Sequence, residues 1–247
     1  KAGYALTVFS RTKANVDAVT ALGAVYAPSP AEVAAASELV IIMVPDSPQV
    51  REVVLGEGGV IHGAKPGLYV VDMSSIAPLA SREIGAALAA VGVRFLDAPV
   101  SGGEPKAVDG TLSVMAGGDV ADFEAVKPVL AAMAASVVRV GEVGAGNVAK
   151  LANQIIVALN IAAMSEALVL ATKAGVEPEM VYQAIRGGLA GSTVLDAKAP
   201  LVMDRKFDPG FRIKLHVKDL ANVLRTANEL HAPLPLTASV MEVMQAM

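Results

Sequence analysis

Six consecutive residues near the start of the chain, Leu39-Val-Ile-Ile-Met-Val44, have no polar side chain. The run is too short for a typical helix and is rich in β-branched residues, so it predicts a strand that is buried on both faces. Strands of this kind lie centrally in parallel sheets, because helices cover both faces of such a sheet. This part of the chain is therefore expected to adopt an α/β fold.

Short strand patterns alternate with helical patterns up to about Val140. Strands are expected at Tyr4–Phe9, Ala24–Tyr26, Leu39–Val44, Leu68–Val71, Phe95–Ala98, Leu112–Ala116 and Val137–Val140. Helices are expected at Pro30–Ala36, Pro78–Val91 and Val120–Ala134. Such alternation is typical of a doubly wound, mostly parallel Rossmann-type sheet.

After Gly146 only helical patterns remain. They cover Asn147–Ala174, a shorter stretch from Pro178 to Gly187, Val194–Asp204, Leu215–Leu230 and the residues from Leu236 onward. We therefore expect an α/β domain over residues 1–142 and an all-α domain over residues 143–247. The long helix is expected to be a buried interdomain helix, because Asn153 and Gln154 interrupt the ~20 predominantly apolar residues that a membrane span needs.

Both ends of the chain have the pattern of interrupted elements. Lys1-Ala-Gly3 is typical of a helix C-terminus with its glycine cap, and Met241–Met247 stops inside a helical pattern. A βαβ unit needs a strand and a turn before such a helix, so we expect the first strand and a glycine-rich loop to lie upstream. Without that loop, residues 1–247 alone are expected to bind a dinucleotide weakly.

The composition excludes several classes of protein. A formal net charge of −4 gives no basic footprint for nucleic acid. The absence of cysteine excludes disulfides, thiolate metal sites and a cysteine nucleophile. The histidines, His62, His216 and His231, are too scattered to predict a metal site. We expect a cytoplasmic protein with no metal, no nucleic-acid partner and no membrane contact.

Two segments have the composition of a reaction site. In Asp97-Ala-Pro-Val-Ser-Gly-Gly103 a short apolar strand runs into a hydroxyl and two glycines, a backbone turn able to bind a carboxylate through N–H groups. Gly144-Ala-Gly-Asn-Val-Ala-Lys150 places one lysine near the start of an apolar helix. Burial would bring the pKa of such an amine toward neutrality, and the amides of Asn153 or Gln154 could orient it. This combination suits reduction of a small acid that carries a carbonyl, although a helical lysine beside amides is also ordinary packing.

The segment Gly144–Ala149 also matches the dinucleotide fingerprint G-x-G-x-x-G/A. That fingerprint requires a second strand within a ∼30-residue unit, and here the helix continues with no strand after it. We therefore interpret the segment as a hinge into the long helix.

Cofactor binding is predicted after the strands of the α/β domain. Ser10-Arg11-Thr12 follows the first strand, at the position that binds the adenosine ribose in dinucleotide-binding folds. Hydroxyls and an arginine would bind a 2′-phosphate, whereas an acidic residue would repel it, so the segment favours NADP over NAD. An ordinary solvated loop residue is the alternative explanation of Arg11. Val44 and Pro45, and separately Ser75, follow apolar strands at the end of the sheet where ligands bind, although turn formation alone explains them equally well.

Four segments together resemble the β-hydroxyacid dehydrogenase family, and within it the branch that reduces tartronate semialdehyde. They are Asp72-Met-Ser-Ser-Ile-Ala-Pro78, Asp97–Ala107, Gly187–Pro200 and His216-Val-Lys-Asp-Leu220. The resemblance extends over essentially the whole chain. It implies a homo-oligomeric enzyme that transfers hydride from NADPH or NADH to a small hydroxy or oxo acid.

The resemblance also implies roles for individual residues. Lys150 is implied as the proton donor, with Asn153 or Gln154 as its amide partner. The implied substrate-binding residues are Ser101, Gly102, Gly103, Phe211 and Asp219. The implied cofactor contacts in this set are Ser75 and Lys218, although a surface ion pair between Lys218 and Asp219 explains that dipeptide on spacing alone.

The expected reaction is reduction of tartronate semialdehyde to D-glycerate. Rival substrates within the family are 3-hydroxyisobutyrate, glyoxylate and succinate semialdehyde, and pocket shape decides among them. A catalytically silent dinucleotide-binding module is the rival of another class. Substitution of Lys150 or Ser101 would favour it, and both residues are present.

Overall fold

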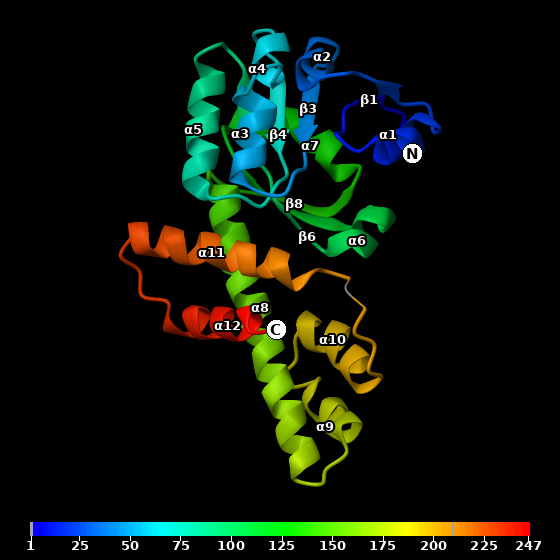
Figure 1. Cartoon of the computed structure of the whole chain (residues 1–247), viewed down its shortest axis with the longest axis vertical. Helices are drawn as coiled ribbons and strands as arrows, with labels where there is room; N and C mark the ends of the chain where they lie inside the picture. The colour runs from blue at the N-terminus through cyan, green and yellow to red at the C-terminus, as the bar shows by residue number, and fades with distance from the viewer. Residues whose placement is uncertain (1, 209) are drawn as a thin grey trace. The chain divides into compact units, whose positions relative to one another are not determined.

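The computed structural model describes residues 2–208 and 210–247. The chain divides into two compact units, the first ending at Lys150 and the second running from Leu151 to Met247. The first unit contains all strands of the described chain, and the second is helical (Figure 1). Each unit is described by itself below.

The first unit contains a six-stranded sheet with the order β3-β4-β5-β7-β6 and with β8 beside β7. Its strands are β3 (Leu39–Ile42), β4 (Tyr69–Asp72), β5 (Arg94–Asp97), β6 (Val100–Ser101), β7 (Leu112–Gly117) and β8 (Ala134–Gly141). β3, β4 and β5 are mutually parallel, as are β7 and β8, whereas β7 is antiparallel to β5 and β6. β1 (Thr7–Val8) and β2 (Val25–Tyr26) form a separate parallel pair. The predicted mostly parallel sheet is confirmed.

Helices cover both faces of the six-stranded sheet (Figure 1). The helices of the first unit before α8 (Ala145–Lys173) are α1 (Lys13–Thr20), which lies beside β2, and α2 (Pro30–Ala35), α3 (Ser47–Leu55), α4 (Val60–Gly63), α5 (Pro78–Ala89), α6 (Gly103–Asp109) and α7 (Val120–Ala131). Val70 and Phe95 pack into one core with α2, α3, α4 and α5, whereas Val71 and Leu96 pack into a second core with α7. Successive side chains of a strand point to opposite faces of the sheet. Adjacent residues of β4 and β5 therefore lie in different cores, one on each face, which confirms the doubly wound arrangement.

The predicted central position of the apolar run at residues 39–44 is wrong. β3 pairs only with β4, so it lies at an edge of the six-stranded sheet. Val40 and Ile42 are buried, but Ile41 and Met43 are exposed. The pattern identified the strand correctly and overestimated its burial, because a continuous apolar run does not show how many neighbours a strand has.

Other boundaries differ by a few residues from the predictions. The helix predicted over Val120–Ala134 ends at Ala131, since Ala134 begins β8. β6 and the helices α1, α3, α4 and α6 were not predicted, because each is short and polar or interrupted by glycine or proline. Gly3 has a φ of 83°, as a helix-capping glycine would, but Lys1 lies outside the described residues.

The second unit consists of helices, as predicted. They are α8 (Ala145–Lys173), which begins in the first unit, α9 (Pro178–Ile185), α10 (Thr193–Met203), α11 (Ile213–Glu229) and α12 (Pro235–Gln245). Within this unit α8 packs with α11 and α12 through Ala158, Leu220 and Val240. It packs with α9 and α10 through Leu168 and Leu195.

The expectation that α8 is buried is wrong over much of its length. The helix is long and apolar enough to cross a bilayer, and only 22% of its most apolar window is buried. Ile156, Val169 and Leu170 are 60%, 59% and 70% exposed. A helix that is apolar on nearly all sides leaves such a face uncovered when neighbouring helices pack on only part of its circumference.

Candidate active site

The two segments singled out in the sequence are in direct contact within the first unit. Asp97, the last residue of β5, accepts hydrogen bonds from the backbone N–H groups of Gly144 at 2.6 Å and Asn147 at 2.7 Å. These N–H groups lie at the start of α8, where a helix has no intrahelical acceptor for them. The Asp97 carboxylate therefore caps α8 from a neighbouring strand.

The glycines at the start of α8 allow this close contact. A Cβ on Gly146 would lie 2.4 Å from the carbonyl oxygen of Met115 and 2.5 Å from that of Asp97. A Cβ on Gly117 would lie 2.5 Å from Oδ1 of Asp97. Gly144 has a φ of 92°, which side chains other than glycine rarely adopt. The G-x-G-x-x-A match thus serves close packing of α8 against β5 and β7.

Asn147 connects the start of α8 to a third segment. Its Oδ1 accepts a hydrogen bond from the backbone N–H of Ile76 at 3.0 Å, and its Nδ2 donates to Oγ of Ser81 at 3.0 Å. The side chain is fully buried. Ile76 follows Ser75 directly, so Asn147 joins the segment that carries this predicted cofactor contact. Sequence reasoning missed Asn147, although a polar residue in the first turn of an apolar helix was a usable signal.

Lys150 follows Asn147 by one helical turn and is 8% exposed. A lysine is rarely buried to this extent unless its amine has a partner. The predicted partly buried amine is therefore present in the first unit, on the helix that Asp97 caps.

The predicted carboxylate-binding turn follows β6. Ser101 ends β6, where it pairs with Ser113 of β7. Gly102 and Gly103 follow with φ values of 130° and 67°. Both values lie in the region where a Cβ causes strain, so this turn depends on glycine. Successive backbone N–H groups in a turn can form an anion-binding concavity.

The predicted cofactor-binding residues lie beyond the carboxyl ends of the strands. Ile42, Asp72 and Asp97 are paired across β3, β4 and β5, so the segments after them start side by side. The backbone N–H of Val44 donates to Oγ of Ser74 at 2.9 Å, which joins the first two segments. Pro45 is exposed and Ser75 is half-buried. Ligands of α/β sheets bind at this edge.

The Ser10-Arg11-Thr12 segment follows β1 in the separate two-stranded sheet. The backbone N–H of Thr12 donates to Oγ of Ser10 at 3.2 Å. The Arg11 guanidinium lies 4.0 Å from Glu52 of α3, and both side chains are about two-thirds exposed, at 68% and 67%. An exposed ion pair of this length contributes little stability, so the guanidinium can reorient toward a phosphate.

The second unit has its own buried polar cluster. Nε2 of Gln154 donates to Asp219 at 2.5 Å, and Nδ2 of Asn153 donates to Oε1 of Gln154 at 2.8 Å. Asp219 also forms an ion pair with Lys218 at 2.7 Å. Both polar groups of the Gln154 side chain are therefore engaged within this unit. The ion pair between Lys218 and Asp219 that their spacing predicts is present. It is not a surface pair, because the Asp219 carboxylate is buried.

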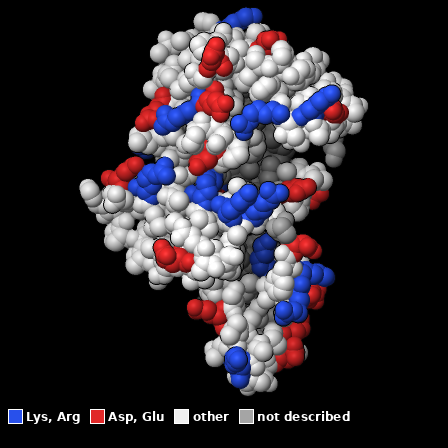
Figure 2. All heavy atoms as spheres, viewed as in Figure 1, with Lys and Arg blue, Asp and Glu red and all other residues white. Residues whose placement is uncertain are grey.

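Phe211 precedes α11 and is 47% exposed. Its ring lies 5.8 Å from that of His216 in an edge-on arrangement, and Nε2 of His216 lies 3.2 Å from the carbonyl oxygen of Gln154. Basic side chains gather over α11 in Figure 2, and the exposed ones at this helix include Lys214 and Arg225. Such a surface favours a negatively charged ligand.

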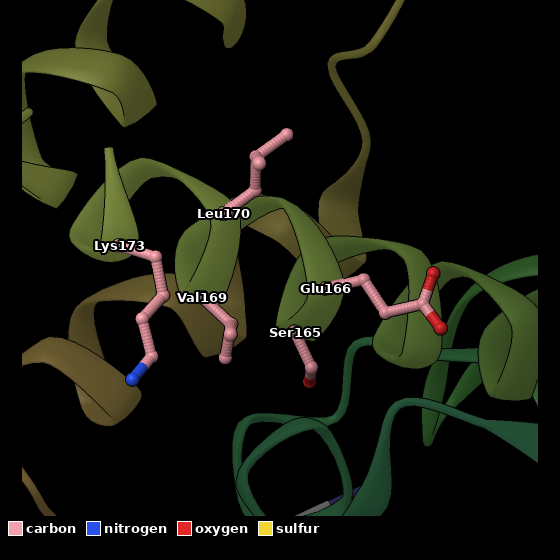
Figure 3. Close-up of a pocket in the computed structure, with 5 residues that line it drawn as sticks. All are labelled: Ser165, Glu166, Val169, Leu170 and Lys173. Atoms are coloured by element: carbon pink, nitrogen blue, oxygen red, sulfur yellow. The ribbon is translucent and has the colours of Figure 1, made fainter.

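A hollow of about 430 Å³ lies on α8 and is lined by Ser165, Glu166, Val169, Leu170 and Lys173. Ser165, Val169 and Lys173 point to one side of the helix (Figure 3). None of the predicted site residues lines this hollow, so it is distinct from the candidate active site. Within the described ranges, no group of three or more His, Cys, Asp or Glu residues is arranged to hold a metal ion.

Models of two domain families match the chain. The NAD binding domain of 6-phosphogluconate dehydrogenase matches residues 1–141. The NAD-binding domain of NADP-dependent 3-hydroxyisobutyrate dehydrogenase matches residues 144–247.

Characterised proteins match over most of the chain. The 2-hydroxy-3-oxopropionate reductase of Escherichia coli K12 is 47% identical over 92% of this chain and 77% of its own length. The 2-(hydroxymethyl)glutarate dehydrogenase of Eubacterium barkeri is 36% identical over 99% of the chain and 82% of its own length. The crystal structure of 3-hydroxyisobutyrate dehydrogenase from Salmonella typhimurium is 35% identical, with a TM-score of 0.86 over 99% of this chain and 86% of that one.

The fold, the residues at the strand ends and these matches define an NAD(P)-dependent hydroxyacid dehydrogenase. The chain belongs to the 3-hydroxyisobutyrate dehydrogenase-like family. The predicted family is thus confirmed. The relatives act on different hydroxy acids, so the family alone does not define the substrate.

Proposed function

We propose that this protein reduces tartronate semialdehyde (2-hydroxy-3-oxopropionate) to D-glycerate, with NADPH as the preferred reductant. The observation that supports this substrate best is the 47% identity to the Escherichia coli 2-hydroxy-3-oxopropionate reductase. The buried Lys150 and the double-glycine turn after Ser101 lie in one unit and supply an amine and an anion-binding backbone.

The residues of the chain fit a nicotinamide dinucleotide. Val44, Pro45 and Ser75 lie beyond adjacent parallel strands, where such cofactors bind, and Lys218 offers a further cation. Ser10, Arg11 and Thr12 carry donors suited to a 2′-phosphate. The bound cofactor supplies the hydride that reduces the aldehyde carbon.

Side chains and backbone N–H groups of the protein transfer the proton and bind the substrate carboxylate. Lys150, as an ammonium, donates a proton to the oxygen of the aldehyde as the C–H bond forms, and takes it back in the oxidation direction. The hydroxyl of Ser101 and the N–H groups of Gly102 and Gly103 bind the substrate carboxylate. Asn153 is the proposed amide partner that orients the lysine and the substrate oxygen. Both polar groups of Gln154 are engaged, one by Asp219 and one by Nδ2 of Asn153, so the role falls to the amide oxygen of Asn153.

A substrate panel on the complete gene product tests this function. The panel contains tartronate semialdehyde, glyoxylate, succinate semialdehyde, 3-hydroxyisobutyrate and 2-(hydroxymethyl)glutarate, each with both cofactors in the appropriate direction. The highest kcat/KM is expected for tartronate semialdehyde with NADPH. A higher value for any other substrate would assign the enzyme to that reaction, and no turnover of any of them would favour the silent dinucleotide-binding module.

We also infer that the exposed apolar face of α8 packs against a second copy of the chain. Glu166, Val169, Leu170 and Lys173 lie on one side of the helix, at spacings of three, four and seven residues. In an antiparallel pair centred between Val169 and Leu170, Glu166 of one copy faces Lys173 of the other. Such self-complementarity is what a two-fold interface requires. A cytoplasmic location remains part of the proposal.

A further inference from the structure

We propose that Asn147 and Asp97 are positioning residues that set the location of Lys150 relative to Ser75 and Ser101. The inference rests on the proposed role of Lys150 as the proton donor. Neither residue is assigned contact with substrate or cofactor. They act through the three segments that they join, and the role of each follows from its hydrogen bonds.

Both side chains are buried and fully engaged. Asp97 uses one carboxylate oxygen for the N–H of Gly144 and the other for the N–H of Asn147. Asn147 uses its carbonyl oxygen for the N–H of Ile76 and its amide nitrogen for Ser81. The two bonds of the Asp97 carboxylate are charge-assisted, and with the two amide bonds of Asn147 they define the orientation of the helix start as well as its distance from β5. The start of α8 is therefore held in a single position.

Each partner segment leads to one predicted functional group. Ile76 is the neighbour of Ser75, the predicted cofactor contact. Asp97 begins the segment that reaches Ser101 four residues later. Asn147 precedes Lys150 by one turn of α8. The hydrogen bonds thus connect the proton donor, the cofactor contact and the carboxylate-binding turn through buried groups.

The backbone packing around these bonds leaves no room for adjustment. A methyl group on Gly146 or Gly117 would overlap backbone or carboxylate atoms at 2.4–2.5 Å. The helix cannot move closer to the sheet, so a shift that follows loss of the Asn147 side chain is directed away from it and displaces Lys150. A misplacement of about 1 Å can lower a reaction rate by about 100-fold.

The test is a double-mutant cycle on the complete gene product, with Asn147→Ala, Lys150→Ala and both together. Asn147→Ala is expected to lower kcat by about 10- to 100-fold, with KM for tartronate semialdehyde changed by less than about threefold. In the Lys150→Ala background the same substitution is expected to change kcat by less than about twofold, because there is no amine left to displace.

Three further variants keep the test decisive: Ser81→Ala, Asp97→Asn and the control Asp119→Asn. Ser81→Ala removes only the acceptor of the Asn147 amide, and it replaces Asn147→Ala if that variant does not fold. It is expected to show the same coupling to Lys150→Ala, with a smaller loss of kcat. Asp119→Asn is the matched control for Asp97→Asn, because Asp119 caps α7 through the N–H groups of Ala121 and Asp122. Asp97→Asn is expected to lower kcat, and Asp119→Asn is expected to leave it unchanged.

Equal losses from Asn147→Ala with and without Lys150, or no loss in either, would overturn the positioning role alone. Full activity of Lys150→Ala would overturn the proposed role of the lysine and this inference together. Methylamine added to Lys150→Ala gives a second readout. Any rate that it restores is expected to be insensitive to Asn147→Ala, because a free amine is not placed by α8.

Discussion

Asp72 and Asp97 are paired at the carboxyl ends of the neighbouring parallel strands β4 and β5, and both side chains are fully buried. Burial raises the pKa of Asp72 to about 7, with a smaller contribution from the nearby Asp97 charge. Burial likewise raises the pKa of Asp97 to about 6, although its backbone donors oppose the shift. Oδ2 of Asp72 has no hydrogen-bond partner among the described residues. Charging this pair is therefore costly to the folded state.

We expect the free energy of unfolding to fall as the pH rises from about 4 to about 7. In this range the unfolded chain releases the Asp72 proton while the folded protein retains it, so the unfolded state is favoured as pH rises. The free energy of unfolding of the wild type should fall more between about pH 5 and 8 than that of Asp72→Asn. The difference between the two falls should be on the order of 2–3 kcal/mol. Urea unfolding at both pH values measures this. Asp109→Asn, at an exposed position, is the control, and parallel profiles for Asp72→Asn and wild type would contradict the assignment.

Lys150→Ala is expected to lower kcat for aldehyde reduction by roughly 10²–10⁴, the usual contribution of a positioned proton donor. Steady-state kinetics of the folded variant measure the loss. Lys127→Ala, which removes a half-buried lysine of α7, should retain wild-type kcat. If kcat of Lys150→Ala falls by less than about fivefold, Lys150 is not the proton donor.

Ser10→Asp is expected to shift cofactor preference from NADPH toward NADH, because a carboxylate beside Arg11 repels a 2′-phosphate and accepts bonds from a 2′-hydroxyl. The ratio of kcat/KM for the two cofactors measures the change. Ser136→Asp adds the same charge at an exposed position of β8 and should leave the ratio unaltered. A wild-type protein with the higher kcat/KM for NADH would show that the Ser10–Thr12 interpretation is wrong.

Leu170→Lys is expected to weaken self-association, since it places a charge in the apolar centre of the proposed α8 pair. Glu166→Lys alone should also weaken association, whereas Glu166→Lys combined with Lys173→Glu should restore it. Light scattering across a concentration series gives the mass of each variant. If none of these substitutions changes the measured mass, α8 does not form the interface.

The sequence by itself determined the class of fold and the segments that carry the chemistry. Apolar runs such as Leu39–Val44 identified strands, and the loss of strand pattern after Gly146 identified the helical part, because both signals depend on residues close together in the chain. The turn at Gly102 and Gly103 was equally readable, since only glycine adopts its backbone conformation without strain.

Only the tertiary structure decided which buried polar groups meet. Asp97 and Asn147 are fifty residues apart, and no local pattern shows that one caps the helix of the other. The edge position of β3 and the uncovered face of α8 likewise depend on which neighbours pack against them. A periodic pattern records that a side chain is apolar, whereas burial and hydrogen bonding are decided by segments that are distant along the chain.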